Sequence, residues 1–425
     1  MHTGSETVAG SRIAVVGGGL AGLLSAALLS RRYRVTLYES AATLAKRVVD
    51  VTLDGQTRPV DVGLAMFGAA SPSLRAMLAS LGVGTRDCAA TLGVSLDAGR
   101  LEWADPDGWF AQRRLLWSPA HLRLLADLRR FRHEAGRLRF AAIATRCDVG
   151  QLLAQAGYGD AFGDGYLRPL AAALWQDPRV DIANLPAAAL LRHFVEHERG
   201  GRRWCCAADP VWRTMLAASI DDVRTAAQVV AIRREALGVL VETAGRVDRV
   251  DAVVLAVTSP ERLLADADGD ESAALAGLKF RTGVVCLHTD RRLLPLARKV
   301  RAPVNWLRRG GEACLSLDLN RLQAPPFATP LVLTVDPLIA PASVIHRFER
   351  RYPVLDHAAR VAQLKLDALQ GRRATWYAGA WTGDGLPEDA VGSALRVAAG
   401  FGVSPDWGRM RNRSGSAGSV DGPDY

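Results

Sequence analysis

The sequence predicts an α/β protein in which a Rossmann-like dinucleotide-binding domain is interleaved with a second, α+β domain. Three observations lead to this prediction. An apolar strand runs into a glycine-rich turn near the N-terminus, strand-like segments of the same kind return near 229–257 and 375–379, and stretches of different character separate them. With 425 residues, the chain is long enough for two domains with cores of their own.

The strongest local signal lies in residues 12–39. Residues 13–16 are apolar and rich in β-branched side chains, and they lead into Gly-Gly-Gly-Leu-Ala-Gly at 17–22. A Leu/Ala-rich helix and a second strand at 34–38 follow. Strand, glycine turn, helix and strand in this order are typical of dinucleotide binding, and Glu39 stands where a carboxylate accepts hydrogen bonds from ribose hydroxyls.

Each residue of the turn has a physical role in this interpretation. Gly17 allows the tight turn, Gly19 lets the backbone approach a pyrophosphate, and Gly22 lets the helix lie close to the strand. The helix N-terminus at Leu20 and Ala21 offers unpaired N–H groups to phosphates. A transmembrane or signal helix is the alternative, and the three glycines followed by the charged restart at 31–32 argue against it.

Composition limits the class of protein. Hydrophobic residues make up 49% and charged residues 23% of the chain, which is typical of a globular enzyme. The net charge of +9 does not by itself choose between acidic ligands, a membrane surface and nucleic acid. We find no nucleic-acid-binding signature, Walker loop or nucleophile elbow. Six cysteines without a CxxC pair, and no signal peptide, predict free thiols and a cytoplasmic location.

The predicted domains alternate along the chain. We expect a disordered N-terminus, three parts of an FAD-binding domain, two parts of a substrate domain and a disordered tail. In chain order these are 1–11 (disordered), 12–75 (FAD), 76–204 (helical, substrate), 205–268 (FAD), 269–370 (substrate), 371–403 (FAD) and 404–425 (disordered).

The helix predicted from Pro119 to Ala135 has two interpretations. Leu122, Leu125 and Leu128 recur at helical spacing, while several arginines lie off that stripe. The helix is either a basic amphipathic element at a membrane surface or an ordinary solvated helix over a core, and the modest apolar face favours the second. At most, therefore, we expect a peripheral membrane contact.

Further motifs carry a resemblance to a known family. They are 13–22 and 35–39, then Phe-Ala-Gln-Arg-Arg at 110–114, Leu-Arg-Pro-Leu at 167–170 with Ala-Leu-Trp at 173–175, Trp-Arg-Thr at 212–214, Cys-Leu-His-Thr-Asp at 286–290 and Gly-Ala-Trp-Thr-Gly at 379–383. With these motifs the chain resembles the flavin-containing amine oxidase and phytoene desaturase superfamily, and more closely a bacterial subgroup of predicted NAD/FAD-binding proteins. The resemblance implies FAD as cofactor and an amine-oxidase-like fold. Members of the subgroup are often encoded near fatty-acid cyclopropane synthases, which implies a small-molecule substrate of lipid type.

The motifs and the resemblance together single out candidate cofactor-binding residues. In chain order they are Gly17, Gly19, Leu20, Ala21, Gly22, Glu39, Ser40, Lys46, Arg47, Val229, Gly379, Ala380, Gly383, Pro387 and Glu388. Pro387 and the acids after it begin a helix that would direct its N-terminus at the flavin.

The chain also departs from the family pattern. Where the superfamily carries two glycine pairs, this sequence has Leu-Ala-Lys-Arg at 44–47 and Ala-Ala-Ser at 217–219, and a Cβ at each place could crowd the cofactor. Lys46 or Arg47 could compensate by pairing with phosphate. Ala380 stands where amine oxidases carry a ribityl-binding acid, and Asp384 where they carry one cage tyrosine.

Trp381 and Asp384 are the candidate catalytic residues. Asp384 either faces the substrate as a base or anchor, or caps a turn between Gly383 and Gly385. Trp175, Trp306 and Trp376 are further candidates for a cavity wall or for core filling. His193 and His197 have zinc-ligand spacing, but without a third ligand we predict no metal site.

We therefore predict an FAD-dependent oxidoreductase of oxidase or desaturase type, which takes a hydride from a C–H bond of an apolar substrate such as a lipid or secondary metabolite. An amine oxidase is one alternative. A divergent protein that has lost tight FAD binding, and acts as a non-redox enzyme or scaffold, is another. An NAD-dependent dehydrogenase fits Glu39 but not the motif at 378–383.

Overall fold

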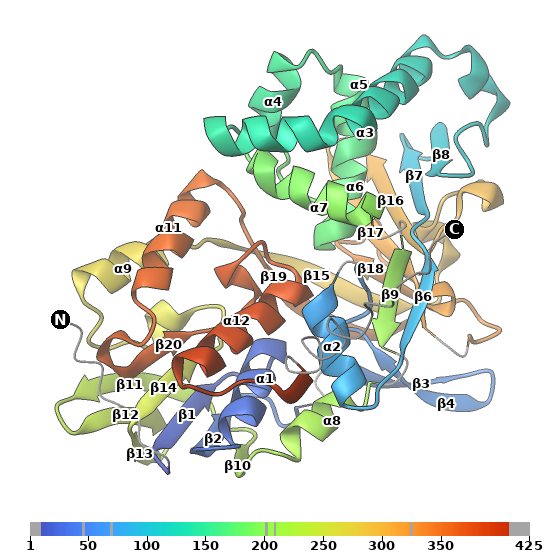
Figure 1. Ribbon diagram of the computed structural model, residues 1–425. Helices are drawn as coiled ribbons and strands as arrows, with labels where there is room; N and C mark the ends of the chain where they lie inside the picture. The colour runs from blue at the N-terminus through green and yellow to red at the C-terminus, as the bar shows by residue number, and fades with distance from the viewer. Residues whose placement is uncertain are drawn as a thin grey trace, which may run out of the picture.

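The computed structural model of the protein describes residues 10–44, 47–68, 71–199, 203–207, 210–323 and 326–407. A five-stranded parallel sheet is the base of one region. Its strand order is β10-β2-β1-β14-β20, and the strands span Asp222–Arg224, Arg34–Tyr38, Arg12–Val16, Ala252–Leu255 and Thr375–Tyr377 (Figure 1). The central strands are covered on both faces, which explains their continuous apolar sequences.

The two faces of this sheet have different cores. Ile13 and Val15 pack with helices on one face, whereas Ala14 and Val16 pack on the other. The first face carries α1 (Leu20–Leu29), α2 (Pro72–Ser80), α8 (Trp212–Ala217) and α12 (Pro387–Gly400). The second carries a three-stranded sheet and two helices, namely β11 (Val229–Glu235), β12 (Gly238–Thr243), β13 (Arg246–Val250), α9 (Gly269–Ala276) and α11 (His357–Ala368).

The second region is built on a seven-stranded sheet of order β19-β15-β18-β17-β16-β7-β8. All neighbours are antiparallel except the pair β16 and β7. The strands span Val344–Pro353, Phe280–His288, Val332–Val335, Glu312–Asp318, Val304–Arg309, Leu92–Leu96 and Leu101–Asp105.

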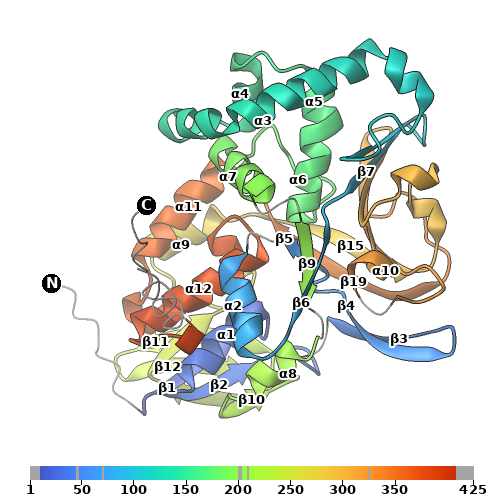
Figure 2. The same ribbon diagram turned by 45° about the vertical axis from the view of Figure 1, so that its right-hand side comes forward.

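A layer of helices covers this region along the top of Figures 1 and 2. It consists of α3 (Pro119–Thr145), α4 (Val149–Gln155), α5 (Asp160–Phe162), α6 (Arg168–Trp175) and α7 (Ala187–Arg199). Smaller elements complete the structure: the hairpin β3 (Val48–Leu53) and β4 (Gln56–Asp61), the sheet of β5 (Phe67–Gly68), β9 (Arg203–Ala207) and β6 (Thr85–Ala89), and α10 (Leu319–Leu322).

The predicted fold class is confirmed, and some local predictions need correction. The sequence also predicts a helix-rich connection at 346–371 and a helix that begins at Pro260. The first segment begins inside β19, and its helix starts only at His357. The second is a single turn, Pro260–Arg262. α9 and α11 lie in the range predicted for the substrate domain, yet Leu275 and Leu366 are buried in the core beside the parallel sheet, because their apolar faces match that sheet.

The long helix α3 buries one stripe and exposes another. Its buried side chains include Leu124, Leu128 and Phe131, whereas Leu122 and Phe140 are exposed. In the part of the chain that the structure describes, no helix is long and apolar enough to cross a bilayer. A peripheral membrane contact of α3 stays a prediction.

Candidate functional site

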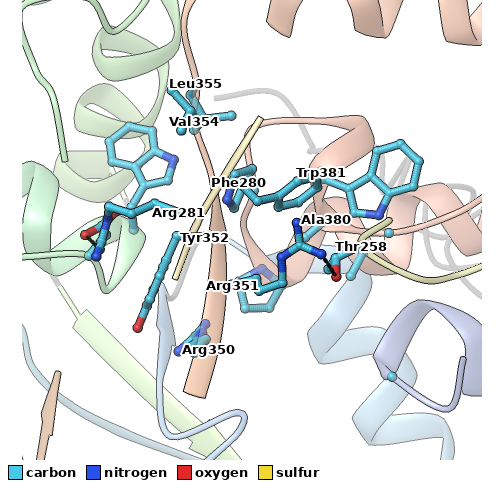
Figure 3. A pocket seen from close by; sticks show the side chains of 18 of the residues that line it. Thr258, Phe280, Arg281, Arg350, Arg351, Tyr352, Val354, Leu355, Ala380 and Trp381 are labelled. Atoms are coloured by element: carbon cyan, nitrogen blue, oxygen red, sulfur yellow. Dashed lines mark hydrogen bonds and ion pairs between the residues drawn. The ribbon is translucent and has the colours of Figure 1, made fainter. Parts of the chain in front are cut away.

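One large cavity lies at the carboxyl ends of the parallel strands, and its volume is about 1050 Å³. Gly19 follows β1, Glu39 follows β2, Ala256 follows β14 and Ala380 follows β20, and all four line it. Side chains of β15 and β19 form the wall on the side of the seven-stranded sheet (Figure 3). Ligands of open α/β sheets bind at this edge, so the cavity is the candidate site.

The glycine turn has the geometry that the sequence suggested. Gly17 has a φ of +107°, and a Cβ there would stand 2.6 Å from the carbonyl oxygen of Ala256. A Cβ on Gly22 would lie 1.9 Å from the carbonyl oxygen of Gly17. Gly19 differs, because a Cβ there would meet no atom within 4 Å. Gly17 and Gly22 are thus required by the fold, whereas the space at Gly19 is open to a ligand.

The N-terminus of α1 is available to an anion. Gly19 precedes the helix without a side-chain cap, and the first turn contains no acid. Leu20 and Ala21, which open the helix, line the cavity. Their backbone N–H groups and the helix dipole suit a phosphate group.

Glu39 stands beside this turn. One carboxylate oxygen accepts a hydrogen bond from the backbone N–H of Gly18 at 2.8 Å, and the other from Ala41 at 2.7 Å. Because Ser40 also donates to the second of these oxygens, one lone-pair site remains, on the oxygen that accepts from Gly18, and a ribose hydroxyl could use it. The hydroxyl of Ser40 donates to Glu39 at 3.1 Å, so Ser40 acts on the site through Glu39.

Arg47 extends into the cavity and carries an unsatisfied donor. Its guanidinium lies 4.0 Å from the ring centroid of Phe348, and Nη2 donates to the carbonyl oxygen of Glu349 at 3.1 Å. Nη1 is buried and has no partner among the described residues. Burial, and next the positive charge of Arg350, lower the pKa of Arg47 to about 10. An anion bound beside Arg47 would accept a hydrogen bond from Nη1 and would stabilise the buried positive charge. Lys46 lies outside the described residues.

The motif at 379–383 forms the opposite wall. Gly379 has a φ of +148°, and a Cβ there would stand 2.3 Å from Nε1 of Trp381. Gly379, Ala380, Trp381 and Pro387 line the cavity. Gly383 does not line it, and its missing Cβ leaves room for the carboxylate of Asp389.

Two predicted cofactor residues lie away from the cavity. Val229 is buried in the core of the three-stranded sheet beside Val16 and Tyr38. The Glu388 carboxylate accepts hydrogen bonds from the backbone N–H groups of Ser73 and Leu74, both at 2.9 Å. Glu388 therefore caps the first turn of α2, which has no cap from its own N-terminal side chain.

We expect Glu388→Ala to lower the free energy of unfolding by about 1 kcal/mol, the usual cost of a lost helix cap. FAD affinity should not change, because the side chain contacts α2 and not the cavity. Urea unfolding and a flavin titration of the same variant measure the two quantities. A weaker FAD affinity with unchanged stability would return Glu388 to the cofactor site.

Asp384 is placed differently from the predicted base. The residue is 3% exposed and is absent from the described residues that line the cavity. The carboxylate accepts hydrogen bonds from Nε2 of His193 at 2.8 Å, from Arg360 at 3.2 Å and from Arg192. It thereby connects the loop before α12 to α7 and α11. This geometry favours a structural role, and the catalytic assignment stays a prediction.

The altered glycine pairs differ in their consequences. Ala217 ends α8 and Ala218 follows it, and neither lines the cavity, although Trp212 and Arg213 of the same helix do. The crowding predicted there is therefore absent from the described cavity wall. The first replaced pair, 45–46, lies outside the described residues.

Sequence reasoning missed the most polar wall of the cavity. Phe348, Arg350 and Tyr352 of β19 all line it, as does Arg281 of β15. The signal for this wall was the alternation of side chains with a period of two along 346–352, which is typical of a strand.

Of the four tryptophans considered, Trp175 and Trp381 line the cavity. Trp306 is fully buried against Pro178, and Trp376 packs on Phe401.

The fold and site define a class: a Rossmann-like dinucleotide-binding region joined to an antiparallel-sheet region, with one cavity between them. Comparison with known proteins agrees. The family model described as NAD(P)-binding Rossmann-like domain matches residues 15–81. No curated protein matches the chain by sequence.

Solved structures match nearly the whole chain. A CLA-producing fatty acid isomerase from P. acnes is 18% identical and covers 92% of this chain and 99% of its own, with a TM-score of 0.60. Wild-type putrescine oxidase bound to putrescine is 13% identical, with coverage of 92% and 98% and a TM-score of 0.66. Cyclohexylamine oxidase from Brevibacterium oxydans IH-35A is 13% identical, with coverage of 95% and 100% and a TM-score of 0.64. The predicted amine-oxidase-like fold is thus confirmed.

Proposed function

We propose that the protein is an FAD-dependent oxidoreductase that removes a hydride from a C–H bond of an apolar substrate, with a lipid acyl chain as the leading candidate. One observation carries the proposal: the uncapped glycine turn, Glu39 and the wall of Trp381 and Phe348 belong to a single cavity. A dinucleotide and a substrate could therefore meet in it.

The residues present fit FAD. The open space at Gly19 and the N-terminus of α1 would hold the phosphates, and Glu39 would hold the ribose. The buried Nη1 of Arg47, which has no partner in the described part of the chain, is a donor that an anion would satisfy. When bound, FAD supplies the hydride acceptor.

The apolar side chains of the cavity suit the substrate part of the proposal. Trp175, Phe280 and Phe348 would exclude water from the reacting carbon. Arg350 and Arg351 line the same space, and among the described residues their polar partners are neutral, namely Gln176, Thr258 and Ser259. Positive charge in the wall disfavours a cationic amine, so an amine oxidase is the weaker alternative.

The visible spectrum of the purified protein tests the proposal. We expect flavin absorbance, and release of stoichiometric FAD on denaturation. A colourless protein that gains no flavin absorbance with added FAD would refute the proposal, and stoichiometric NADH binding would then favour a dehydrogenase. FAD that binds but is reduced by no apolar substrate in stopped-flow mixing would favour the non-redox alternative.

A further inference from the structure

One face of β19 carries a cationic and aromatic wall. Phe348, Arg350 and Tyr352 alternate along the strand, so their side chains share a face, and all three line the cavity. In Figure 3, Arg350 and Tyr352 lie across the cavity from Trp381. We refer to Phe348, Arg350 and Tyr352 as the β19 wall.

Tyr352 has an unused donor in this wall. The residue is 4% exposed, and its hydroxyl has no hydrogen-bond partner among the described residues. The ring lies between two guanidinium groups, with centroid distances of 4.9 Å to Arg281 and 5.2 Å to Arg350. Burial raises the pKa of Tyr352 to about 12, so the phenol keeps its proton at neutral pH. A buried hydroxyl without a partner is costly, and a ligand that accepts its hydrogen bond would remove that cost.

The charges around Tyr352 do not balance. Arg281 is paired with Asp177 and, at 2.9 Å, with Asp336. Arg179 also pairs with Asp336, at 2.9 Å. Among the described residues, the side-chain hydrogen bond of Arg350 goes to a neutral acceptor, the side-chain oxygen of Gln176, at 3.2 Å. Arg179 and Arg281 thus share two carboxylates, whereas Arg350 has no acidic partner among the described residues.

We propose that Arg350 and Tyr352 together anchor a monoanionic carboxylate of the substrate. The inference rests on the proposed function only in taking the cavity as the substrate site. The guanidinium would bind the carboxylate with two parallel N–H donors, and the phenol would donate to one of its oxygens. Phe348, Phe280 and Leu355 line the same space and suit an apolar remainder. The substrate class is therefore an apolar carboxylic acid in its ionised form.

Calorimetric titration with decanoate and with decanamide tests this assignment. The two probes have the same chain and differ in the charge of the head group. The full-length protein is titrated with FAD present and without it. We expect decanoate to bind about 10-fold or more tightly than decanamide, because hydrogen bonds to a charged group are the strong ones.

Three variants locate the effect. Arg350→Gln should remove the preference for decanoate. Tyr352→Phe should weaken decanoate binding by about 10-fold and decanamide binding by less, because a hydrogen bond to the neutral amide oxygen is weaker than one to a carboxylate. Arg351→Gln is the matched control, because Arg351 is the neighbouring cation but hydrogen-bonds to Thr258 and Ser259 instead. It should keep most of the preference.

Several outcomes would overturn the proposal that Arg350 and Tyr352 anchor a carboxylate. Equal affinities of the wild type for the two probes would do so, as would an equal loss of preference in Arg351→Gln. So would an Arg350→Gln variant that loses FAD affinity but keeps its preference for decanoate, since Arg350 would then serve the cofactor. Decanoate preference in a protein that never binds FAD would support the anchor and refute the proposed function, so the two failures are distinguishable.

Discussion

Gly19→Ala is expected to abolish tight FAD binding while the ligand-free protein keeps its stability. A Cβ at Gly19 meets no atom within 4 Å, and the residue has an ordinary φ of −71°, so alanine costs the fold almost nothing. The same methyl group would occupy the approach to the uncapped N-terminus of α1. Losing one charge-assisted hydrogen bond to a phosphate corresponds to about 10- to 100-fold in the dissociation constant.

Gly22→Ala is the matched comparison, since it adds the same methyl group three residues later. There the Cβ would stand 1.9 Å from the carbonyl oxygen of Gly17, which is backbone and cannot move aside. We expect this variant to unfold at lower urea concentration or to fail to fold. Urea unfolding without ligand and flavin titration of both variants give the result. Unchanged FAD affinity in Gly19→Ala would show that no phosphate lies against this turn.

Asp384→Asn is expected to lower the free energy of unfolding by about 3 kcal/mol at pH 6, the usual cost of removing one partner from a buried ion pair. Asn keeps the size of the side chain but leaves Arg192, His193 and Arg360 without their carboxylate. Turnover should fall only in step with the folded fraction. A fall of about 10²-fold with unchanged stability would instead make Asp384 a catalytic residue.

The pH dependence of the free energy of unfolding gives an independent check on the ion pair between His193 and Asp384. Burial alone would lower the pKa of His193, but its hydrogen bonds to Asp384 and Glu196 outweigh burial and raise it. Burial would likewise raise the pKa of Asp384, and the contact with His193 outweighs it and lowers that pKa. The Asp384 contribution is present above about pH 3.9 and is lost as the pH falls through its lowered pKa. The His193 contribution is present below about pH 6.5 and is lost as the pH rises through its raised pKa.

The wild type should therefore lose stability between pH 6 and pH 9, and Asp384→Asn should lose less over the same interval. In the variant, His193 has lost its main hydrogen-bond acceptor, so burial dominates its pKa. Protonated His193 then contributes little to the free energy of unfolding, and little can be lost when the pH is raised. Urea unfolding of both proteins at the two pH values measures the difference. Identical pH dependence in both would remove the His193–Asp384 ion pair from the stabilising contacts.

Some predictions followed from short stretches of sequence because the physics there is local. Gly17 has a positive φ and Gly22 lies against the carbonyl oxygen of Gly17, so these requirements for glycine arise inside the turn. Asp54-Gly55 is likewise a local hairpin signal, and it joins β3 to β4. The helix predicted at Pro387 begins where its proline and its acids indicated.

The β19 wall was missed because its pattern is ambiguous. Phe348 and Tyr352 stand four residues apart, and that spacing puts two side chains on one face of a helix as well as of a strand. The charged residues between them weakened the alternation that marks a half-buried strand. Pairing with β15 over nine residue pairs decided the matter, because the backbone hydrogen bonds of a strand are made with a distant segment.

The unit from β1 to β2, with its glycine turn and Glu39 at its end, could be predicted from the sequence because each part depends on neighbours along the chain. The contacts of Asp384, Glu388 and Arg350 could not, because folding brings their partners from distant parts of the chain. Asp384 meets Arg192 and His193, which lie 192 and 191 residues away, and Glu388 meets Ser73, which lies 315 residues away. A carboxylate near a helix start can cap, pair or catalyse, and the partner that the fold brings to it selects the role.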